Sequence, residues 1–425
     1  MITLATIPLL ASLLLTQPTT PEAPPEPLER VLIDRTLSHQ AVRVSSIDAT
    51  TVRIIDAAGR SQALARADVL ALLPPLPQLD PPHIPDPAPL PRPTRINRFP
   101  IQEPAPTNAV APAMGRLELT DGQVLPGALT PGGKDESVAW RSNLWGPLEV
   151  PLDNIATIVT NTKRFDAAAE AFRPTEDGVL LANGDRLEGF VASVTTDVKL
   201  EQGDKVTSLP LTRIDGVRLA NPVRPAPGAW VWTADTAAAV SQITLNTSGA
   251  YTLAGRIPGA TSQPTATEPG ESIHAVCFDA GALHALAAMP MTVPPPRDDP
   301  ARRWTSPPSI TPGLTPLGAA DIELPGPIRV EWTLPRGATR FSAILELPPS
   351  ARLWGDCEAV IEAVGPSNNA VPLAREPLNQ SRPTAVVNAP LSNATRLRIT
   401  IDPGPSGPIQ DRVFIRRALV LAPAR

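Results

Sequence analysis

Two ten-residue segments of this chain repeat the same spacing of turn-forming and apolar residues. They are LTDGQVLPGA at 119–128 and LANGDRLEGF at 181–190, and each contains an Asx-Gly pair, then an apolar residue, then a second glycine. Each is followed roughly 20 to 25 residues later by a matching apolar segment, EVPLDNIATIV at 149–159 and SLPLTRIDGVRL at 208–219. The repetition predicts two copies of one small β module.

The two copies occupy residues 115–160 and 177–220. In each, the Asx-Gly pair supports a turn with positive φ and the second glycine permits a sharp bend, so we expect a bent sheet of about five short strands. Residues 28–73 end in a similar segment, ALARADVLALL, and are interpreted as a degenerate first copy with a hairpin turn from Asp56 to Gly59. Such small units are expected to pack on one another or to self-associate.

One helix is predicted, in the segment KRFDAAAEAF at 163–172 between the two copies. Asp166 is the expected cap of this Ala-rich stretch, and Pro174 prevents the helix from continuing.

Proline is concentrated in two stretches of this chain, which has 55 prolines. Residues 17–27 form a Pro-rich spacer, and residues 74–113 carry proline at short intervals with few apolar residues between, which predicts an extended linker. A docking ligand for a proline-binding domain is the alternative interpretation of the linker.

The N-terminus predicts export. Residues 1–16 contain a short apolar run followed by polar residues and proline, which is typical of a signal peptide rather than of a membrane span. An uncleaved N-terminal anchor is the alternative, because no basic residue precedes the run. No later segment is long and apolar enough to span a bilayer, so the expected location is secreted, periplasmic or cell-surface.

Composition excludes several classes of function. With 425 residues and 42% apolar content, the chain has room for two to four domains. A net charge of −5 and the lack of a Lys/Arg run argue against a nucleic-acid partner. The four histidines show no zinc-hydrolase spacing, and no nucleophile elbow or phosphate-binding loop is present, so we expect no enzyme and no cofactor.

The second half of the chain, residues 226–425, contains a series of half-buried strands. Ile328, Val330 and Trp332 alternate with charged residues. Apolar residues also recur at every second position in RFSAILEL at 340–347 and in LRITI at 397–401. Such alternation predicts an antiparallel β-sandwich. The fold class expected for the whole chain is mainly β, with barrel-like repeats followed by a C-terminal jelly-roll.

Two family resemblances accompany these patterns. The Asn-Gly-Asp-x-Leu-x-Gly core of residues 183–189 looks like the Sm-like β-barrel repeats of exported bacterial proteins, which implies a small barrel. The C-terminal region resembles the NPCBM family, the novel putative carbohydrate-binding modules of galactose-binding-like fold. That similarity rests on the Gly-Pro-x-x-Val-x-Trp strand at 326–332, the Gly-Asp-Cys segment at 355–357 and a closing strand from Asp411. It implies a sugar ligand, although Phe414 stands where the family carries tryptophan.

A sugar site needs an aromatic face for C–H groups and planar polar side chains for hydroxyls. Trp304 and Trp354 are the candidate aromatic residues because both lie beside turn sequences. Arg352, Asp356 and Asp411 are the candidate polar residues. The alternative for each tryptophan is packing in the core or at the rim of the sandwich.

Other candidate chemistry is sparse. Two carboxylate pairs, Asp321 with Glu323 and Asp356 with Glu358, have the residue types of a glycosidase but a spacing common on solvated strands. A calcium ion is a candidate for binding at Asp298-Asp299 or at Asp356. Cys277 and Cys357 are candidates for one disulfide in an oxidising compartment, or for two buried free thiols.

These observations lead to one expected function and two rivals. The expected function is an exported, non-enzymatic protein whose jelly-roll binds carbohydrate or a cell-surface glycan. The first rival is an assembly protein in which the β modules form a homo-oligomer or bind a protein partner. The second rival is a carbohydrate-active hydrolase.

Overall fold

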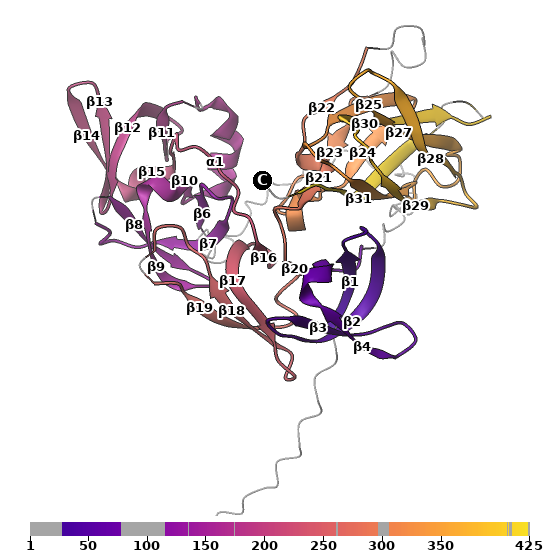
Figure 1. Cartoon of the computed structure of the whole chain (residues 1–425). Coiled ribbons are helices and arrows are strands. Elements are labelled where there is room, and N and C mark those ends of the chain that lie inside the picture. The colour runs from indigo at the N-terminus through magenta and orange to yellow at the C-terminus, as the bar shows by residue number, and fades with distance from the viewer. Residues whose placement is uncertain are drawn as a thin grey trace, which may run out of the picture.

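The computed structural model describes residues 28–77, 115–295 and 306–423, apart from residues 135, 174, 261, 406, 408 and 409. The fold is mainly β, as expected, and consists of small bent sheets followed by a sandwich (Figure 1). The expected signal peptide, the Pro-rich spacer, Trp304 and nearly all of the expected linker lie outside the described residues. In the part of the chain that is described, no helix has the length and hydrophobicity to cross a membrane.

Module one, residues 28–73, is a sheet that curls until its last strand returns to its first. The first strand pairs with the second and the fifth, the second with the third, and the third with the fourth. Its strands are β1 (Leu28–Asp34), β2 (His39–Ile47), β3 (Thr51–Ile55), β4 (Ser61–Ala65) and β5 (Val69–Leu73).

Modules two (115–159) and three (177–218) repeat this pairing pattern. In both, the Asx-Gly turn has the expected positive φ, +92° at Gly122 and +91° at Gly184. Module two has β6 (Gly115–Leu119), β7 (Val124–Leu129), β8 (Ser137–Ser142), β9 (Gly146–Pro151) and β10 (Ile155–Val159). Module three has β11 (Asp177–Leu181), β12 (Arg186–Val194), β13 (Asp197–Gln202), β14 (Lys205–Pro210) and β15 (Ile214–Arg218).

Residues 229–277 form a fourth module. The sandwich therefore begins after this module and not at the expected boundary, residue 226. The strands of this segment pair in the same order as those of module one. The reason is that the last strand of this segment bonds to β5 of module one, whereas none of its strands pairs with a strand of the sandwich in the described residues. The strands are β16 (Ala229–Trp232), β17 (Ala237–Leu245), β18 (Ala250–Gly255), β19 (Thr265–Pro269) and β20 (Ala275–Cys277).

The four modules associate through their last strands. Strand β10 of module two pairs with β15 of module three, and β5 of module one pairs with β20 of module four. In sequence order, modules two and three, which pair with each other, therefore lie between modules one and four, which also pair with each other. Because strand pairing satisfies backbone groups that an edge would expose, each small sheet is stabilised by its neighbour.

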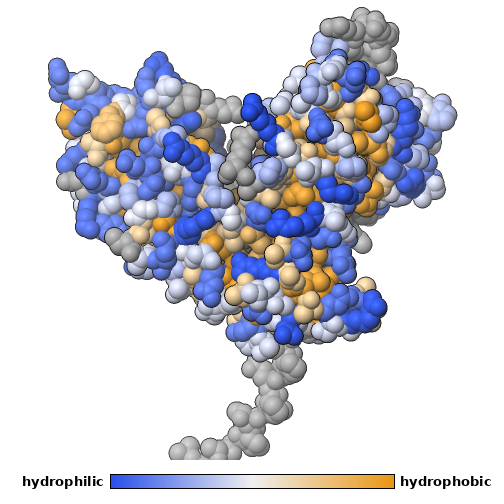
Figure 2. Space-filling view, viewed as in Figure 1, coloured by the Kyte–Doolittle hydropathy of each residue, from blue (hydrophilic) through white to orange (hydrophobic). Residues whose placement is uncertain are grey.

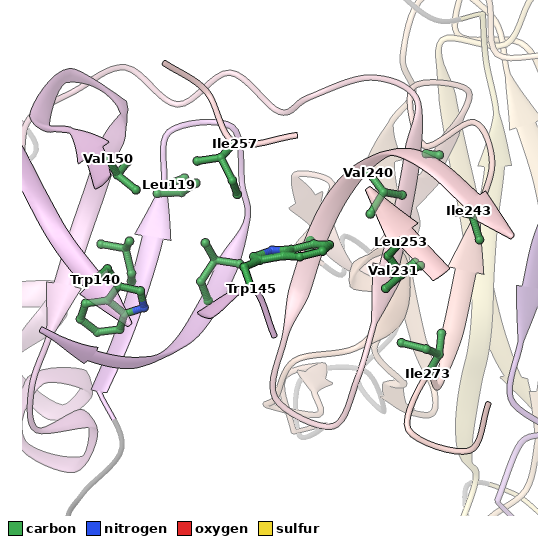
Figure 3. Packing of buried hydrophobic residues seen from close by; sticks show 14 of the residues in the cluster. Leu119, Trp140, Trp145, Val150, Val231, Val240, Ile243, Leu253, Ile257 and Ile273 are labelled. Atoms are coloured by element: carbon green, nitrogen blue, oxygen red, sulfur yellow. The ribbon is translucent and has the colours of Figure 1, made fainter. Parts of the chain in front are cut away.

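Modules two and four share a core. Trp145, in the β8–β9 turn, is 6% exposed and lies in the same apolar cluster as Ile257 and Leu253 (Figure 3). Its indole occupies space that a side chain at Gly255 would take, since a Cβ there would lie 3.2 Å from Cζ2 of Trp145. The contact fixes module two against strand β18.

The sandwich consists of two antiparallel sheets. One contains β21 (Leu283–Ala285), β23 (Ser309–Ile310), β24 (Ile322–Pro325), β26 (Arg340–Glu346), β29 (Thr384–Pro390) and β31 (Arg412–Leu421). The other contains β22 (Met291–Thr292), β25 (Ile328–Thr333), β27 (Cys357–Val364), β28 (Ala370–Leu378) and β30 (Arg396–Pro403). Trp332 and Phe341 fill the core between them, and both are fully buried. Successive strands change sheet repeatedly, as in a jelly-roll.

Module one contacts the sandwich directly. Ser342 Oγ lies 3.2 Å from Nε2 of His39, and the side-chain amide of Asn388 donates to the Thr36 carbonyl at 3.0 Å. Leu283, at the start of the sandwich strand β21, also lies in one apolar cluster with Ile33 and Leu73 of module one. Figure 2 shows hydrophilic and hydrophobic residues mixed over the visible face.

The structure corrects one local expectation and decides between the two alternatives for the cysteines. The helix α1 (Thr162–Ala168) is capped by Asn161, whose side chain accepts from the Arg164 N–H, because Asp166 lies inside the helix and pairs with Arg116 at 2.6 Å. Cys277 and Cys357 are both buried free thiols and do not form the candidate disulfide, since they belong to different sheets.

Candidate functional site

The exposed tryptophan Trp354 lies in a tight turn between β26 and β27. The N–H groups of Trp354 and Gly355 both donate to the Ala351 carbonyl, at 3.1 and 2.6 Å. Because Ala351 is itself buried, the turn is anchored from below and its outer residues face solvent. Trp354 is 62% exposed and its neighbour Leu353 is 61% exposed. The two side chains form a small exposed apolar patch at this turn.

Two carboxylates adjoin the same turn. Asp356 follows Trp354 by two residues and is half-buried, and its backbone N–H donates to Oδ1 of Asp411 at 3.4 Å. Asp411 is 2% exposed, and its Oδ2 is buried without a hydrogen-bond partner. Burial raises the pKa of Asp411 to about 6; the Asp356 N–H opposes this, and the Asp356 charge adds to it.

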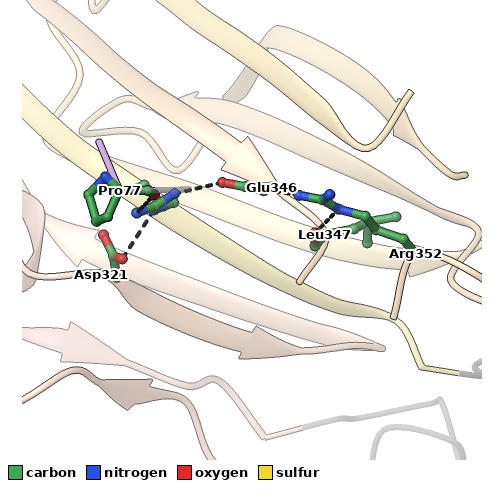
Figure 4. A network of polar contacts seen from close by, with 6 residues as sticks. Pro77, Asp321, Glu346, Leu347 and Arg352 are labelled. Atoms are coloured by element: carbon green, nitrogen blue, oxygen red, sulfur yellow. Dashed lines mark hydrogen bonds and ion pairs between the residues drawn. The ribbon is translucent and has the colours of Figure 1, made fainter. Parts of the chain in front are cut away.

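Arg352 is committed to structural contacts. Its Nε donates to the Leu347 carbonyl at 3.2 Å and its Nη2 to Glu346 at 2.7 Å (Figure 4). Glu346 also accepts from Arg416 at 2.8 Å, and Arg416 contacts Asp321 at 3.1 Å. Arg352 therefore holds the turn on the sheet rather than presenting all its donors to a ligand.

The structure brings four of the five candidate sugar-binding residues to one end of the sandwich. Trp354, Arg352 and Asp356 belong to one turn, and Asp411 lies beneath it at the start of β31. Trp304, the fifth, lies outside the described residues. Trp354 does not follow the packing alternative, because most of its side chain is exposed.

The carboxylate pairs considered for hydrolysis are occupied by arginines. Asp321 pairs with Arg416 at 3.1 Å, and Glu323 accepts from Nε of Arg412 at 2.6 Å. Glu358 pairs with Arg375 at 2.7 Å. A glycosidase needs two carboxyl groups free to face one bond. Of these four carboxylates, only Asp356 has no ion pair with an arginine in the part of the chain that the structure describes.

The described residues offer neither a metal-binding cluster nor a reactive thiol. No group of three or more His, Cys, Asp or Glu side chains has the arrangement of a metal site there, and Asp298-Asp299 lies outside those residues. Burial raises the pKa of both Cys277 and Cys357 to about 12, which keeps the thiols protonated and unreactive.

Sequence reasoning missed the arginine and carboxylate network centred on Arg416. A signal was present, because Arg416 and Arg417 interrupt the apolar run VFIRRALVL, and buried arginines require partners. The partners could not be chosen from sequence, since Glu346 is 70 residues away and Asp321 is 95 residues away.

Comparisons with known proteins find no family model that matches the chain and no curated protein that matches its sequence. Weak structural likenesses exist. CBM51 from Clostridium perfringens GH95 in complex with methyl-galactose has 11% identity and a TM-score of 0.21, over 24% of this chain and 69% of that one. The tandem CBM51 modules of Sp3GH98, the family 98 glycoside hydrolase from Streptococcus pneumoniae SP3-BS71, have 10% identity and a TM-score of 0.25, over 60% and 91%.

A third likeness is to the CBM51-2 and INT domains from Clostridium perfringens ZmpB, with 10% identity, a TM-score of 0.24 and coverage of 46% of this chain and 40% of that one. This chain therefore spans well under two thirds of that structure. TM-scores of this size do not transfer a ligand to this chain, and the site stands on its own geometry.

Proposed function

We propose that this protein is exported and binds carbohydrate, without turning it over, through the turn that carries Trp354. The observation that carries the proposal is the 62% exposure of Trp354 beside the carboxylate of Asp356. An indole face packs on the C–H groups of a sugar ring, and a neighbouring carboxylate accepts hydrogen bonds from its hydroxyls. The rigid turn beneath Trp354 lowers the entropy lost on binding.

The remaining candidates take supporting roles in this proposal. Asp411 orients Asp356 through the backbone N–H, and Arg352 anchors the turn through Glu346 and Leu347. A non-enzymatic role is favoured because the other candidate carboxylates are held in ion pairs. Hydrolysis needs a second free carboxyl group on the opposite side of the bond.

The decisive test is glycan-array binding by the full chain, comparing the wild type with Trp354→Ala. Phe190→Ala is the matched control, because Phe190 is an exposed aromatic residue at 63% exposure in module three. We expect saturable binding to one glycan class, lost in Trp354→Ala and kept in Phe190→Ala, with unchanged thermal unfolding in both. A chelator arm tests for a metal requirement. A blank array with folded wild-type protein would refute the proposal.

Association through the β modules is a second candidate, supported by an apolar row on module three. Phe190 and Val206 are 63% and 60% exposed, and strand register places them on either side of Glu201. Two exposed apolar side chains on one face of a sheet, here with Glu201 between them, favour protein contacts. Sedimentation of the wild type and Phe190→Asp tests this, with a concentration-dependent oligomer lost in the variant as the supporting result.

A further inference from the structure

Arg417 is a buried cation held in an uncommon backbone conformation. It is 5% exposed and has φ of +48°, at a register shift where β31 meets β26. Its Nη2 donates to the Pro74 carbonyl of the segment that follows module one. Within the described residues it has no ion pair, whereas its neighbour Arg416 contacts Asp321, Glu346 and the Pro77 carbonyl.

The charges around Arg417 do not balance. Three arginines, Arg352, Arg416 and Arg417, share two carboxylates, Asp321 and Glu346. His39 also faces Arg417 and adds no positive charge at neutral pH, because burial and the Arg417 charge lower its pKa to about 4. Among these five groups there is one more positive than negative charge, and Asp34 is a further carboxylate that acts on His39. A buried charge without a partner is strongly unfavourable, and burial lowers the pKa of Arg417 to about 10. An anion bound beside Arg417 would offset this cost.

A cavity of about 210 Å³ lies beside this unpaired group. Its polar lining residues are Arg416, Arg417, Thr311, Thr315 and Asp321, and the Asp321 carboxylate is paired with Arg416 at 3.1 Å. The other lining residues are apolar and include Leu73, Pro75, Pro316 and Ala319. Its volume is below that of sites for drug-sized ligands, so it suits a small molecule with one charged and one apolar end.

We propose that this cavity binds a small organic monoanion, with a carboxylate against Arg417 and an apolar body against the proline wall. Arg417 supplies charge-assisted hydrogen bonds through the nitrogens that the Pro74 carbonyl does not occupy. Bound there, the ligand contacts both the segment after module one and the sandwich, so it also strengthens their contact. The site is separate from Trp354 and independent of the carbohydrate proposal.

Benzoate and its uncharged counterpart benzamide provide the test on the full chain, at constant ionic strength set with sodium chloride. Saturation-transfer NMR and the thermal midpoint are the readouts. We expect benzoate, and not benzamide or phosphate, to bind and to raise the midpoint. In Arg417→Gln the benzoate affinity should fall roughly tenfold to a hundredfold, and in Arg375→Gln, which removes an exposed arginine, it should not change.

A second variant decides the matter if Arg417→Gln does not fold. Ala319→Met fills the apolar end of the cavity and leaves Arg417 in place, so benzoate binding should again be lost. Equal effects of benzoate and benzamide on the wild type would overturn the proposal. Unchanged benzoate affinity in either variant, or phosphate binding in place of benzoate, would do the same.

Discussion

Oε1 of Gln123 accepts a hydrogen bond of 3.0 Å from the backbone N–H of Ala239, 116 residues away in the sequence. The same side chain donates to the Arg256 carbonyl at 2.9 Å, and it is fully buried. One glutamine at the start of module two thus satisfies two backbone groups of module four. Modules two and four form one folded body partly because of this residue.

Replacing Gln123 with Leu should destabilise the protein by about 2 to 4 kcal/mol, because two buried backbone groups lose their partner. Urea unfolding followed by circular dichroism measures the loss. Gln202→Leu is the control, since Gln202 is exposed and its side-chain amide donates to the Glu188 carbonyl within the same module. Equal stability of the two variants would show that the Gln123 contacts do not join the modules.

Gly255→Val should cost about 1 to 3 kcal/mol through overpacking against Trp145 and Pro264. Gly365→Ala is the control, because a Cβ at Gly365 meets its nearest atom only at 3.9 Å. Thermal unfolding of both variants checks the expectation. A Gly255→Val protein with unchanged stability and unchanged tryptophan fluorescence would contradict the packing of modules two and four.

The repeated turns made modules two and three predictable. Gly122 and Gly184 require positive φ, which only a few residues tolerate, so the turn is specified locally. The fourth module has no such pair, since Asp235 and Thr236 occupy its first turn. Its last segment, PGESIHAV at 269–276, does match PLDNIATI at 151–158 in the placement of apolar residues, and that was the available signal.

In the candidate site, too, local features could be predicted from the sequence and long-range contacts could not. Trp354 was recognisable because turn residues surround it, and exposure of a turn is a local property. The pairing of Arg416 with Glu346 depends on β31 lying next to β26, which only the tertiary structure decides. Whether Arg417 has an ion-pair partner depends on which distant carboxylates the fold brings near it, so the local sequence does not indicate it.

Glu346→Ala should destabilise the sandwich by about 3 to 5 kcal/mol, because buried Arg416 loses one of its two carboxylate partners. Glu358→Ala removes an exposed partner of Arg375 and should cost no more than about 1 kcal/mol. Denaturant unfolding of both variants gives the comparison. Similar losses would mean that the Arg416 network contributes little to stability.

Both cysteines should be free and unreactive in the native protein. Burial raises the pKa of each thiol to about 12, so little thiolate exists at pH 8 for reaction with Ellman's reagent. Two thiols per chain should react once guanidinium unfolds the protein. Finding none in the denatured, unreduced chain would reveal a disulfide.

The pKa of Asp411 gives stability a specific pH dependence. Burial raises it from an ordinary 3.8 to about 6, so below pH 4 the group is protonated in both the folded and unfolded states. Between pH 4 and 6 the unfolded state loses this proton while the folded state keeps it. The contribution of Asp411 to stability therefore falls as pH rises, and above pH 6 the penalty approaches about 3 kcal/mol.

Asp411→Asn removes this penalty and keeps an oxygen that accepts from the Asp356 N–H. The variant should match the wild type near pH 4 and exceed it in stability at pH 7, as measured by urea unfolding across that range. Asp48→Asn should show the opposite trend, because the Thr50 and Thr51 N–H groups lower the pKa of Asp48 and its ionised form supports folding at neutral pH. A stability difference between Asp411→Asn and the wild type that does not change with pH would show that Asp411 is ionised in the folded protein throughout this range. The group beneath the Trp354 turn would then be a solvated carboxylate and not a buried acid.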